Sequence, residues 1–337
     1  MIRIHENFSL KKFNTFGIEA NSRYFIEFDT KHDIEDIIQG KEFEENNTLI
    51  LGGGSNVLFT KDFNGLIIHP NVKGIETEDE NNTAIWLKVN CGEVWDEFVA
   101  YCNEKKYGGI ENLSLIPGNV GAVPIQNIGA YGAEVKNIIT KVNVFDLEEG
   151  KTKIFSNSDC QFGYRESFFK KEKKTKYVVL SVTFKLSKKP VLNLSYAKVA
   201  DEMKRFGDKD IRNLRKAIIA IRKSKLPDIE KIGNAGSFFK NPIVPVQKVL
   251  EIQRDYPEVP IYQYNKENMK VAAGWLIEKC GWKGFSEGET GVYHKQALVI
   301  INKGRASGKA ILKFSEKIKK SVLKNFNIQL EPEVLIL

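Results

Sequence analysis

One stretch, Gly108–Gly132, constrains the fold of this chain more than any other. Its sequence, GGIENLSLIPGNVGAVPIQNIGAYG, holds six glycines and two prolines, and most of its other residues are Ile, Leu, Val or Ala. A surface loop does not need so apolar an irregular backbone. Because glycine adopts positive φ and lets main chain approach a ligand closely, the stretch indicates peptide N–H groups turned toward a bound molecule. A run of tight turns between buried strands explains the glycines equally well.

The totals predict an ordinary globular protein. A length of 337 residues favours two or three packed units. Without a long apolar run or the apolar core of a signal peptide, we expect a cytoplasmic protein that does not associate with membranes. The four cysteines form no CxxC pair and the four histidines no HxxxH spacing, so we expect reduced thiols and no metal site. The sequence does not fix the oligomeric state, and we expect a monomer.

The formal charge of +8 suits an anionic ligand such as a nucleotide, although it can also mean only a basic surface. The densest basic cluster, Lys170–Lys176, lies between two strand-like runs and predicts a solvated hairpin tip. It lacks the interleaved aromatic residues of a single-strand binder, and the chain has no zinc finger or RNP motif. We therefore expect no nucleic-acid partner.

Residues 1–72 predict a small α/β unit. A strand from Ser22, a helix beginning near Thr30 and a strand from Thr48 lead into GGGSN, Gly52–Asn56, and a further strand follows from Leu66. A glycine loop at the carboxyl end of a strand is a place for phosphate. It matches neither the Walker motif nor GxGxxG, so a plain turn remains the alternative.

Residues 73–215 and 216–337 predict two α+β domains. The acidic run at 72–84 predicts a boundary or exposed turn, and alternating runs from Lys141 and Tyr177 predict a mixed or antiparallel sheet. Arg165, flanked by aromatic residues, must meet an anion or pair with an acid such as Glu166. In the predicted helix at 211–224, five basic residues are expected to face water: Arg212, Arg215, Lys216, Arg222 and Lys223.

Several motifs in one order resemble a known family. They are LGGGSN, IPGNVGAVPIQNIGAYG, FGYRESFF, KLPD, GNAGSFFKNP, AAGWLIEKCG and LEPEV. Together they resemble the UDP-N-acetylenolpyruvoylglucosamine reductases, bacterial flavoenzymes that make UDP-N-acetylmuramate for peptidoglycan. The resemblance runs from Asn14 to the C-terminus. LSYAKVADEM, which contains Tyr196, resembles the family's first type, in which a tyrosine loop covers the substrate.

The resemblance implies a fold and a cofactor. The fold is α+β, with a two-domain FAD-binding module of the vanillyl-alcohol-oxidase type followed by a C-terminal substrate domain. It implies non-covalent FAD, with its pyrophosphate against the two glycine stretches, and NADPH as co-substrate. The implied cofactor residues are Gly52, Gly53, Gly54, Ser55, Asn56, Pro117, Gly118, Gly121, Gln126, Asn127, Gly129, Ala130, Tyr131 and Gly132.

The resemblance also assigns roles by position. Arg165, Ser237 and Glu333 fall on the family's catalytic positions. Tyr196, Lys225, Asn241 and Gln296 match residues that hold the UDP-sugar. One departure is that Leu335 stands where family members often have arginine, so one substrate contact is missing or is supplied from elsewhere.

The implied chemistry explains these residue types. Hydride from flavin N5 adds to the methylene carbon of an enol ether, and negative charge spreads into the substrate carboxylate. A cation and a protonated acid, Arg165 and Glu333, suit the stabilisation of that charge. Ser237 suits the role of proton donor to the neighbouring carbon. FAD supplies the redox chemistry and the protein supplies orientation and electrostatics.

Two other functions stay open. One is a flavin oxidase that shares the cofactor fold and acts on a sugar or alcohol. Such oxidases often attach flavin through His or Cys, and neither residue occurs in the glycine stretches. The other is a non-catalytic protein that binds a nucleotide sugar, against which the presence of Arg165, Ser237 and Glu333 argues.

Overall fold

The computed structural model describes residues 3–171 and 176–337. The chain forms two compact units. The first contains the residues up to Phe8, Asn21–Gly54 and Phe63–Lys223, and the second contains Ser9–Ala20, Ser55–Asp62 and Ser224–Leu337. The chain passes from one unit to the other within the GGGSN loop, between Gly54 and Ser55. The division into three domains at residues 72 and 215 stays a prediction.

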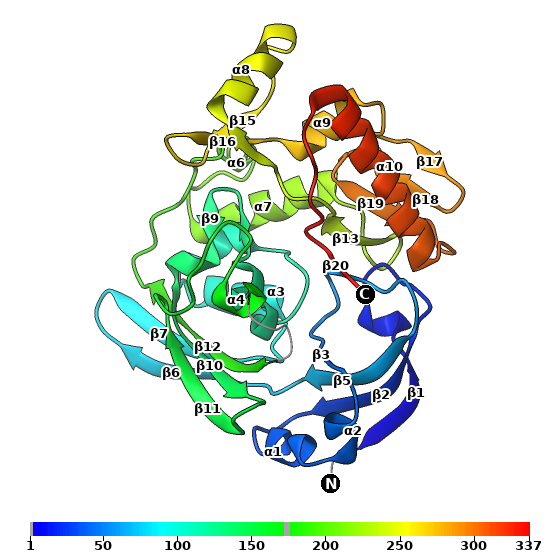
Figure 1. The fold of residues 1–337 in the computed structure, drawn as a ribbon. Coiled ribbons are helices and arrows are strands. Elements are labelled where there is room, and N and C mark those ends of the chain that lie inside the picture. Colours follow the sequence, from blue (N-terminus) through cyan, green and yellow to red (C-terminus); the bar gives the residue numbers. More distant parts are fainter. Residues whose placement is uncertain (1–2, 172–175) are drawn as a thin grey trace. The chain divides into compact units, whose positions relative to one another are not determined.

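The first unit begins with a four-stranded sheet in the order β1-β2-β5-β3 (Figure 1). β2 and β3 both run parallel to β5, and α1 and α2 connect β2 to β3. Ile34 and Ile37 of α1 are buried in one core cluster with Ile26 and Phe28 of β2. The predicted strand, helix and strand are therefore confirmed. The bounds are β1 Ile4–Ser9, β2 Asn21–Phe28, α1 Asp33–Ile38, α2 Lys41–Glu44, β3 Thr48–Ile50 and β5 Phe63–Pro70.

A five-stranded antiparallel sheet in the order β11-β10-β12-β7-β6 follows in the same unit. Helix α3 packs on it through Trp95 and Phe98, whose rings lie 5.8 and 5.1 Å from that of Phe184. The strands are β6 Ile75–Glu80, β7 Ala84–Asn90, β10 Ile139–Asp146, β11 Lys151–Ser156 and β12 Tyr177–Ser187, and α3 is Trp95–Glu104.

The prediction of a boundary or exposed turn at 72–84 is wrong for residues 75–80, whereas residues 81–83 form an exposed turn between β6 and β7. The acidic residues of the run form β6, the edge strand of the five-stranded sheet, with nearly all its side chains exposed. Pairing to β7 needs only backbone groups, so the strand requires no apolar side chains. Charges on an edge strand also hinder pairing with other chains.

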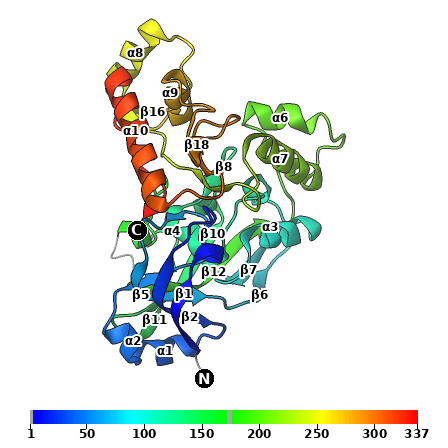
Figure 2. The ribbon, with the colours of Figure 1, turned by 90° about the vertical axis from the view of Figure 1, so that its right-hand side faces the viewer.

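The glycine stretch folds into short turns of helix and one small hairpin beside this sheet. They are η2 Glu111–Leu113, η3 Val120–Ala122, α4 Val123–Gln126, β8 Gly129–Ala130, β9 Ala133–Glu134 and η4 Val135–Asn137. Part of the predicted basic hairpin tip, 172–175, lies outside the described residues; α5 Phe168–Lys171 precedes it. Helices α6, Ala197–Met203, and α7, Ile211–Lys225, lie against each other and share a core of Val199, Met203, Leu214 and Ile218 (Figure 2).

The second unit contains two further sheets, ordered β13-β19-β18-β17 and β14-β16-β15. The long predicted helix is confirmed as α10, whose first turn is capped by Ser307 through the amide of Ala310. The C-terminal strand β20 pairs in parallel with β4. The bounds are η1 Lys11–Phe13, β4 Val57–Leu58, β13 Gly233–Ser237, β14 Ile243–Pro245, α8 Val246–Asp255, β15 Ile261–Gln263, β16 Asn268–Val271, α9 Ala273–Lys279, β17 Ser286–Glu287, β18 Thr290–Val292, β19 Val299–Asn302, α10 Gly308–Phe326 and β20 Leu335–Ile336.

Two general features concern only the described part of the chain. None of its helices combines the length and the apolar character that crossing a membrane requires. It also contains no group of three or more His, Cys, Asp or Glu residues that could hold a metal ion.

Candidate functional site

The two glycine loops of the sequence analysis meet in the first unit. A Cβ atom placed on Gly53 would lie 2.7 Å from Asn119 Oδ1 and 3.0 Å from Gly118 Cα. The contact with Gly118 Cα is tighter than nearly all Cβ contacts, so a side chain at position 53 would force the two closely approaching backbones apart, which favours glycine there. Gly54 and Gly118 adopt φ of +62° and +116°, which also favour glycine. The structure therefore places residues predicted for one ligand side by side.

These loops also fit a negatively charged group. Among the hydrogen bonds of the described residues, none has the backbone amide of Gly53, Gly54 or Gly118 as its donor. Clustered amides of this kind form a concave site for phosphate oxygens. The donor set thus fits the diphosphate of a dinucleotide cofactor, as the sequence predicts, and the individual cofactor contacts stay predictions.

The end of the glycine stretch is tied to the segment that carries Tyr196. The side-chain amide of Asn112 donates to the backbone carbonyls of Tyr131 at 2.9 Å and Asn193 at 3.0 Å. Asn193 in turn donates to the carbonyl of Gly132 at 3.0 Å. The rings of Tyr131 and Tyr196 meet edge to face, 5.4 Å apart. A predicted cofactor residue and a predicted substrate residue are therefore neighbours, and the covering role of the Tyr196 loop stays a prediction.

Arg165 belongs to the same unit and has a strained backbone. Its φ of +54° is unfavourable for an arginine, so surrounding contacts must fix it. Its Nη2 donates to the carbonyl of Gly129 at 2.7 Å, and Lys170 donates to the carbonyl of Arg165 at 3.0 Å. A Cβ on Gly129 would lie 3.2 Å from Arg165 Nη1, so glycine there leaves room for the guanidinium. The predicted catalytic arginine thus lies against the predicted cofactor stretch.

Glu134 completes this part of the site. Burial acts to raise the pKa of its carboxyl, but hydrogen bonds from Lys136 and Asn127 outweigh burial, and the positive charges of Lys136 and Arg165 add to them. Its pKa therefore lies below the usual value, and the group is a carboxylate at neutral pH. Asn127 also donates to the carbonyl of Gly163 at 2.8 Å, which joins the glycine stretch to the loop before Arg165.

In the second unit, Ser237 and Glu333 come from neighbouring extended segments. Ser237 ends β13, and the amide of Glu333 donates to the carbonyl of the next residue, Phe238, at 2.8 Å. Phe238 and Phe239 are buried and hold this segment in the core, while Ser237 itself stays half-exposed. Two predicted catalytic residues that are far apart in sequence are thus adjacent in the fold.

Two of the predicted UDP-sugar residues also lie together in this unit. Asn241 Oδ1 accepts a hydrogen bond from the amide of Ala273, the first residue of α9, at 3.0 Å. Gln296 Oε1 would lie 3.1 Å from a Cβ atom on Gly274, the next residue. Lys225 is the last residue of α7. The assignment of these residues to the substrate stays a prediction.

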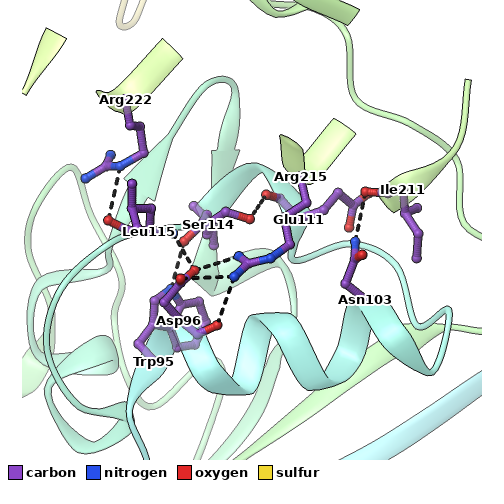
Figure 3. A network of polar contacts seen from close by, with 10 residues as sticks. Trp95, Asp96, Asn103, Glu111, Ser114, Leu115, Ile211, Arg215 and Arg222 are labelled. Atoms are coloured by element: carbon purple, nitrogen blue, oxygen red, sulfur yellow. Dashed lines mark hydrogen bonds and ion pairs between the residues drawn. The ribbon is translucent and has the colours of Figure 1, made fainter. Parts of the chain in front are cut away.

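The prediction that Arg215 and Arg222 face water is wrong (Figure 3). Arg215 forms a two-point ion pair with Asp96, at 2.6 and 3.0 Å, and its side chain is only 14% exposed. Arg222 Nε donates to the carbonyl of Leu115 at 3.2 Å. Burial lowers the pKa of Arg222, while the tyrosine hydroxyl of Tyr131 and the carboxylate of Asp96 oppose that effect. The apolar stripe of α7 does not indicate these partners, because they belong to segments that are distant in the sequence.

Comparison with known proteins defines the class. Residues 22–156 match the family model described as an FAD binding domain, and residues 227–337 match the model of the UDP-N-acetylenolpyruvoylglucosamine reductase C-terminal domain. The chain is therefore an FAD-containing oxidoreductase. The reductase of Flavobacterium johnsoniae is 43% identical over 339 residues, covering all of both chains, and that of Bacteroides fragilis is 41% identical over 331 residues, covering 98% and 99%. The chain belongs to the UDP-N-acetylenolpyruvoylglucosamine reductase family.

Solved structures agree on the fold. The reductase of Thermus caldophilus aligns with a TM-score of 0.70 at 21% identity, over 100% of this chain and 99% of that chain. A solvent-stable cholesterol oxidase aligns with a TM-score of 0.50 at 10% identity, over 98% and 87%. The predicted α+β flavoprotein fold, with an FAD-binding domain and a C-terminal domain of the reductase family, is confirmed, and so is FAD as the cofactor.

Proposed function

We propose that this protein reduces UDP-N-acetylenolpyruvoylglucosamine to UDP-N-acetylmuramate with NADPH, in the cytoplasmic stage of peptidoglycan biosynthesis. Family membership over the whole chain supports the substrate. The observation that carries the mechanism is the adjacency of Ser237 and Glu333 on bonded segments, because the reaction needs both a proton donor and an acid near one substrate group. The cytoplasmic location and the monomeric state stay predictions.

FAD, when bound, would supply the chemistry for hydride transfer from NADPH to the methylene carbon of the enol ether. The two glycine loops would hold its diphosphate through the amides of Gly53, Gly54 and Gly118. Neither histidine nor cysteine occurs in these loops, which supports non-covalent binding. We therefore expect the flavin to leave the protein on denaturation.

Side chains of the protein then stabilise the developing negative charge and donate the proton. As the methylene carbon gains hydride, negative charge develops at the neighbouring carbon and in the substrate carboxylate. The guanidinium of Arg165 and the carboxyl group of Glu333 stabilise that charge, and they do so more strongly in the transition state than in the ground state. The hydroxyl of Ser237 gives its proton to the neighbouring carbon, which completes the addition of two hydrogens across the double bond.

The remaining assigned residues hold the substrate in place. Tyr196, Lys225, Asn241 and Gln296 bind the UDP-sugar, and a positively charged lysine suits the diphosphate. Leu335 carries no such charge. Its amide donates to the carbonyl of Asn56 at 3.0 Å, so in this chain the residue contributes backbone pairing at that position.

A two-stage absorbance experiment tests the proposal. The purified holoenzyme should be yellow, NADPH should bleach it in the absence of oxygen, and the enolpyruvyl substrate should restore the colour with UDP-N-acetylmuramate as the product by mass spectrometry. A flavin oxidase would instead be bleached by a sugar or alcohol and restored by oxygen. A binding protein without catalysis would retain the substrate but show neither change, and either result would overturn the proposal.

A further inference from the structure

Side chains from helices α3 and α7 form hydrogen bonds with the backbone amide and carbonyl of Leu115 (Figure 3). Its amide donates to Asp96 Oδ1, and its carbonyl accepts from Arg222 Nε at 3.2 Å. Both terminal nitrogens of Arg215 donate hydrogen bonds to the Asp96 carboxylate, at 2.6 and 3.0 Å. Arg215 and Arg222 both project from α7, two turns apart. Asp96 of α3, held by Arg215, and Arg222 of α7 thus fix both backbone polar groups of Leu115.

The backbone of Leu115 needs this support. Its φ of +59° places a bulky residue in the left-handed region, which costs free energy and persists only where surrounding contacts enforce it. The next residues lead directly into the glycine loop: Pro117 restricts Ile116 to extended conformations, and Gly118 lies against Gly53. The backbone conformation of Leu115 therefore determines where the Gly118 loop lies.

Partial burial of the Asp96–Arg215 ion pair carries a desolvation cost. The Asp96 carboxylate is 25% exposed and Arg215 only 14%, so both give up much of their hydration. The geometry repays that cost, because the planar guanidinium meets both carboxylate oxygens. The remaining hydrogen bond of Asp96 goes to an irregular segment, the amide of Leu115, rather than to a sheet or helix core.

We propose that Asp96 and Arg215 are positioning residues for the flavin: they hold Leu115 in its left-handed conformation and so pre-form the Gly118 loop against the Gly53 loop. This inference rests on the proposed assignment of these loops to the cofactor diphosphate. Neither side chain needs to touch the cofactor. Their effect is on how tightly FAD is retained, because a loop that must be ordered on binding lowers affinity.

The test measures how fast FAD leaves the purified holoenzyme after dilution, from the recovery of free-flavin fluorescence. We expect Asp96→Ala and Arg215→Met each to accelerate release about tenfold, and the double variant to add little to either single change, because one interaction is lost in each case. Asp96→Asn keeps the acceptor for Leu115 but loses the charge, so it should give a smaller acceleration. Arg215→Lys should recover part of the retention, since it keeps the charge but not the fork.

Lys153→Met is the matched control. Lys153 pairs with the buried carboxylate of Asp146 at 2.7 Å in the same unit, and the described side-chain hydrogen bonds of these two residues join only each other, Glu148 and Glu149. The Lys153→Met variant should have a lower melting temperature than the wild type and an unchanged rate of flavin release. Equal acceleration in this control, or unchanged release in folded Asp96→Asn and Arg215→Met, would overturn the inference. If Gly118→Ala also leaves the rate of FAD release unchanged, the assignment of the loop to the cofactor fails as well. If Gly118→Ala releases FAD faster, only the positioning role of Asp96 and Arg215 fails.

Discussion

The side-chain amide of Asn56 donates a hydrogen bond to the backbone carbonyl of Glu333, with 3.1 Å between nitrogen and oxygen. The carbonyl of Asn56 accepts from the amide of Leu335 at 3.0 Å, and the amide of Glu333 donates to Phe238. Glu333 is therefore fixed on one side by the residue that ends the GGGSN loop and on the other by the residue that follows Ser237. Asn56, predicted to contact the cofactor, has a second task in the placement of the proposed acid.

Removing the Asn56 side chain should therefore slow the step in which the substrate is reduced. For Asn56→Ala we expect stopped-flow absorbance to show flavin reduction by NADPH near the wild-type rate. Reoxidation by the enolpyruvyl substrate should be slowed about tenfold, the effect of about 1.4 kcal/mol from one lost hydrogen bond. Asn46→Ala, which removes a similar side-chain bond to the carbonyl of Glu42, is the control and should change neither rate. A variant that loses its flavin would show that cofactor contact is the main role of Asn56.

Ser237 should be required for only one half of the catalytic cycle. With Ser237→Ala, NADPH should still bleach the flavin, because that step needs no proton from the serine. Reoxidation by substrate should fall by about 100-fold to 10,000-fold, the usual contribution of a positioned acid. Ser237→Cys retains a group that can donate a proton and should recover part of the rate. Unimpaired reoxidation of the alanine variant would remove Ser237 from the mechanism.

Arg165 should also act mainly in substrate reduction. Arg165→Met keeps the apolar stem but removes the charge, and we expect reoxidation to slow by about 100-fold to 1,000-fold, as with other lost transition-state donors. Arg165→Lys should recover little, since a single ammonium cannot reproduce the bond to Gly129 and a second contact together. Circular dichroism checks that the variants keep the overall fold. An equal loss in both half-reactions would point to damage of the fold instead.

The sequence predicts those parts of the site that lie in contiguous motifs. The glycine loops, the helix of Ile211–Lys225 and the candidates Ser237 and Glu333 are each visible in a short run of residues, because turn chemistry and periodicity are local properties. Pairing of distant segments is not local. Asp96 and Arg215 are 119 positions apart, and Asn56 and Glu333 are 277 positions apart, so no spacing could have joined them.

The same limit explains the two wrong predictions. The acidic residues of β6 predict a boundary or exposed turn, yet an edge strand is held by backbone bonds to β7 and tolerates charge. The helix pattern predicts a solvated face for Arg215 and Arg222 because charged residues on a helix usually face water. In both cases a neighbour from another part of the chain decided the outcome.

Asp146 gives a pH-dependent test of stability in the first unit. Its side chain is fully buried and accepts hydrogen bonds from Lys153 Nζ at 2.7 Å and from the amides of Glu148 and Glu149 at 3.0 and 3.1 Å. Burial acts to raise the pKa of this carboxyl, but these bonds outweigh it and hold the pKa below its usual value. A group whose pKa is lowered on folding stabilises the protein above its unfolded pKa, about 3.9, and loses that contribution as the pH falls through the folded pKa.

Asp146→Asn should therefore lower the free energy of unfolding at pH 7 by about 1–3 kcal/mol, because Lys153 loses its charged acceptor while the two amides keep theirs. Urea titrations at pH 7, 5 and 3 should show the full difference from wild type at the first two values and a smaller difference at pH 3, because the contribution declines once the pH falls below the unfolded pKa. Asp201→Asn removes the exposed partner of Lys204 and should change stability little at any pH. A constant difference down to pH 3 would mean that shape, and not ionisation, makes Asp146 important, since only a charge-dependent contribution fades when the carboxylate is protonated in both states.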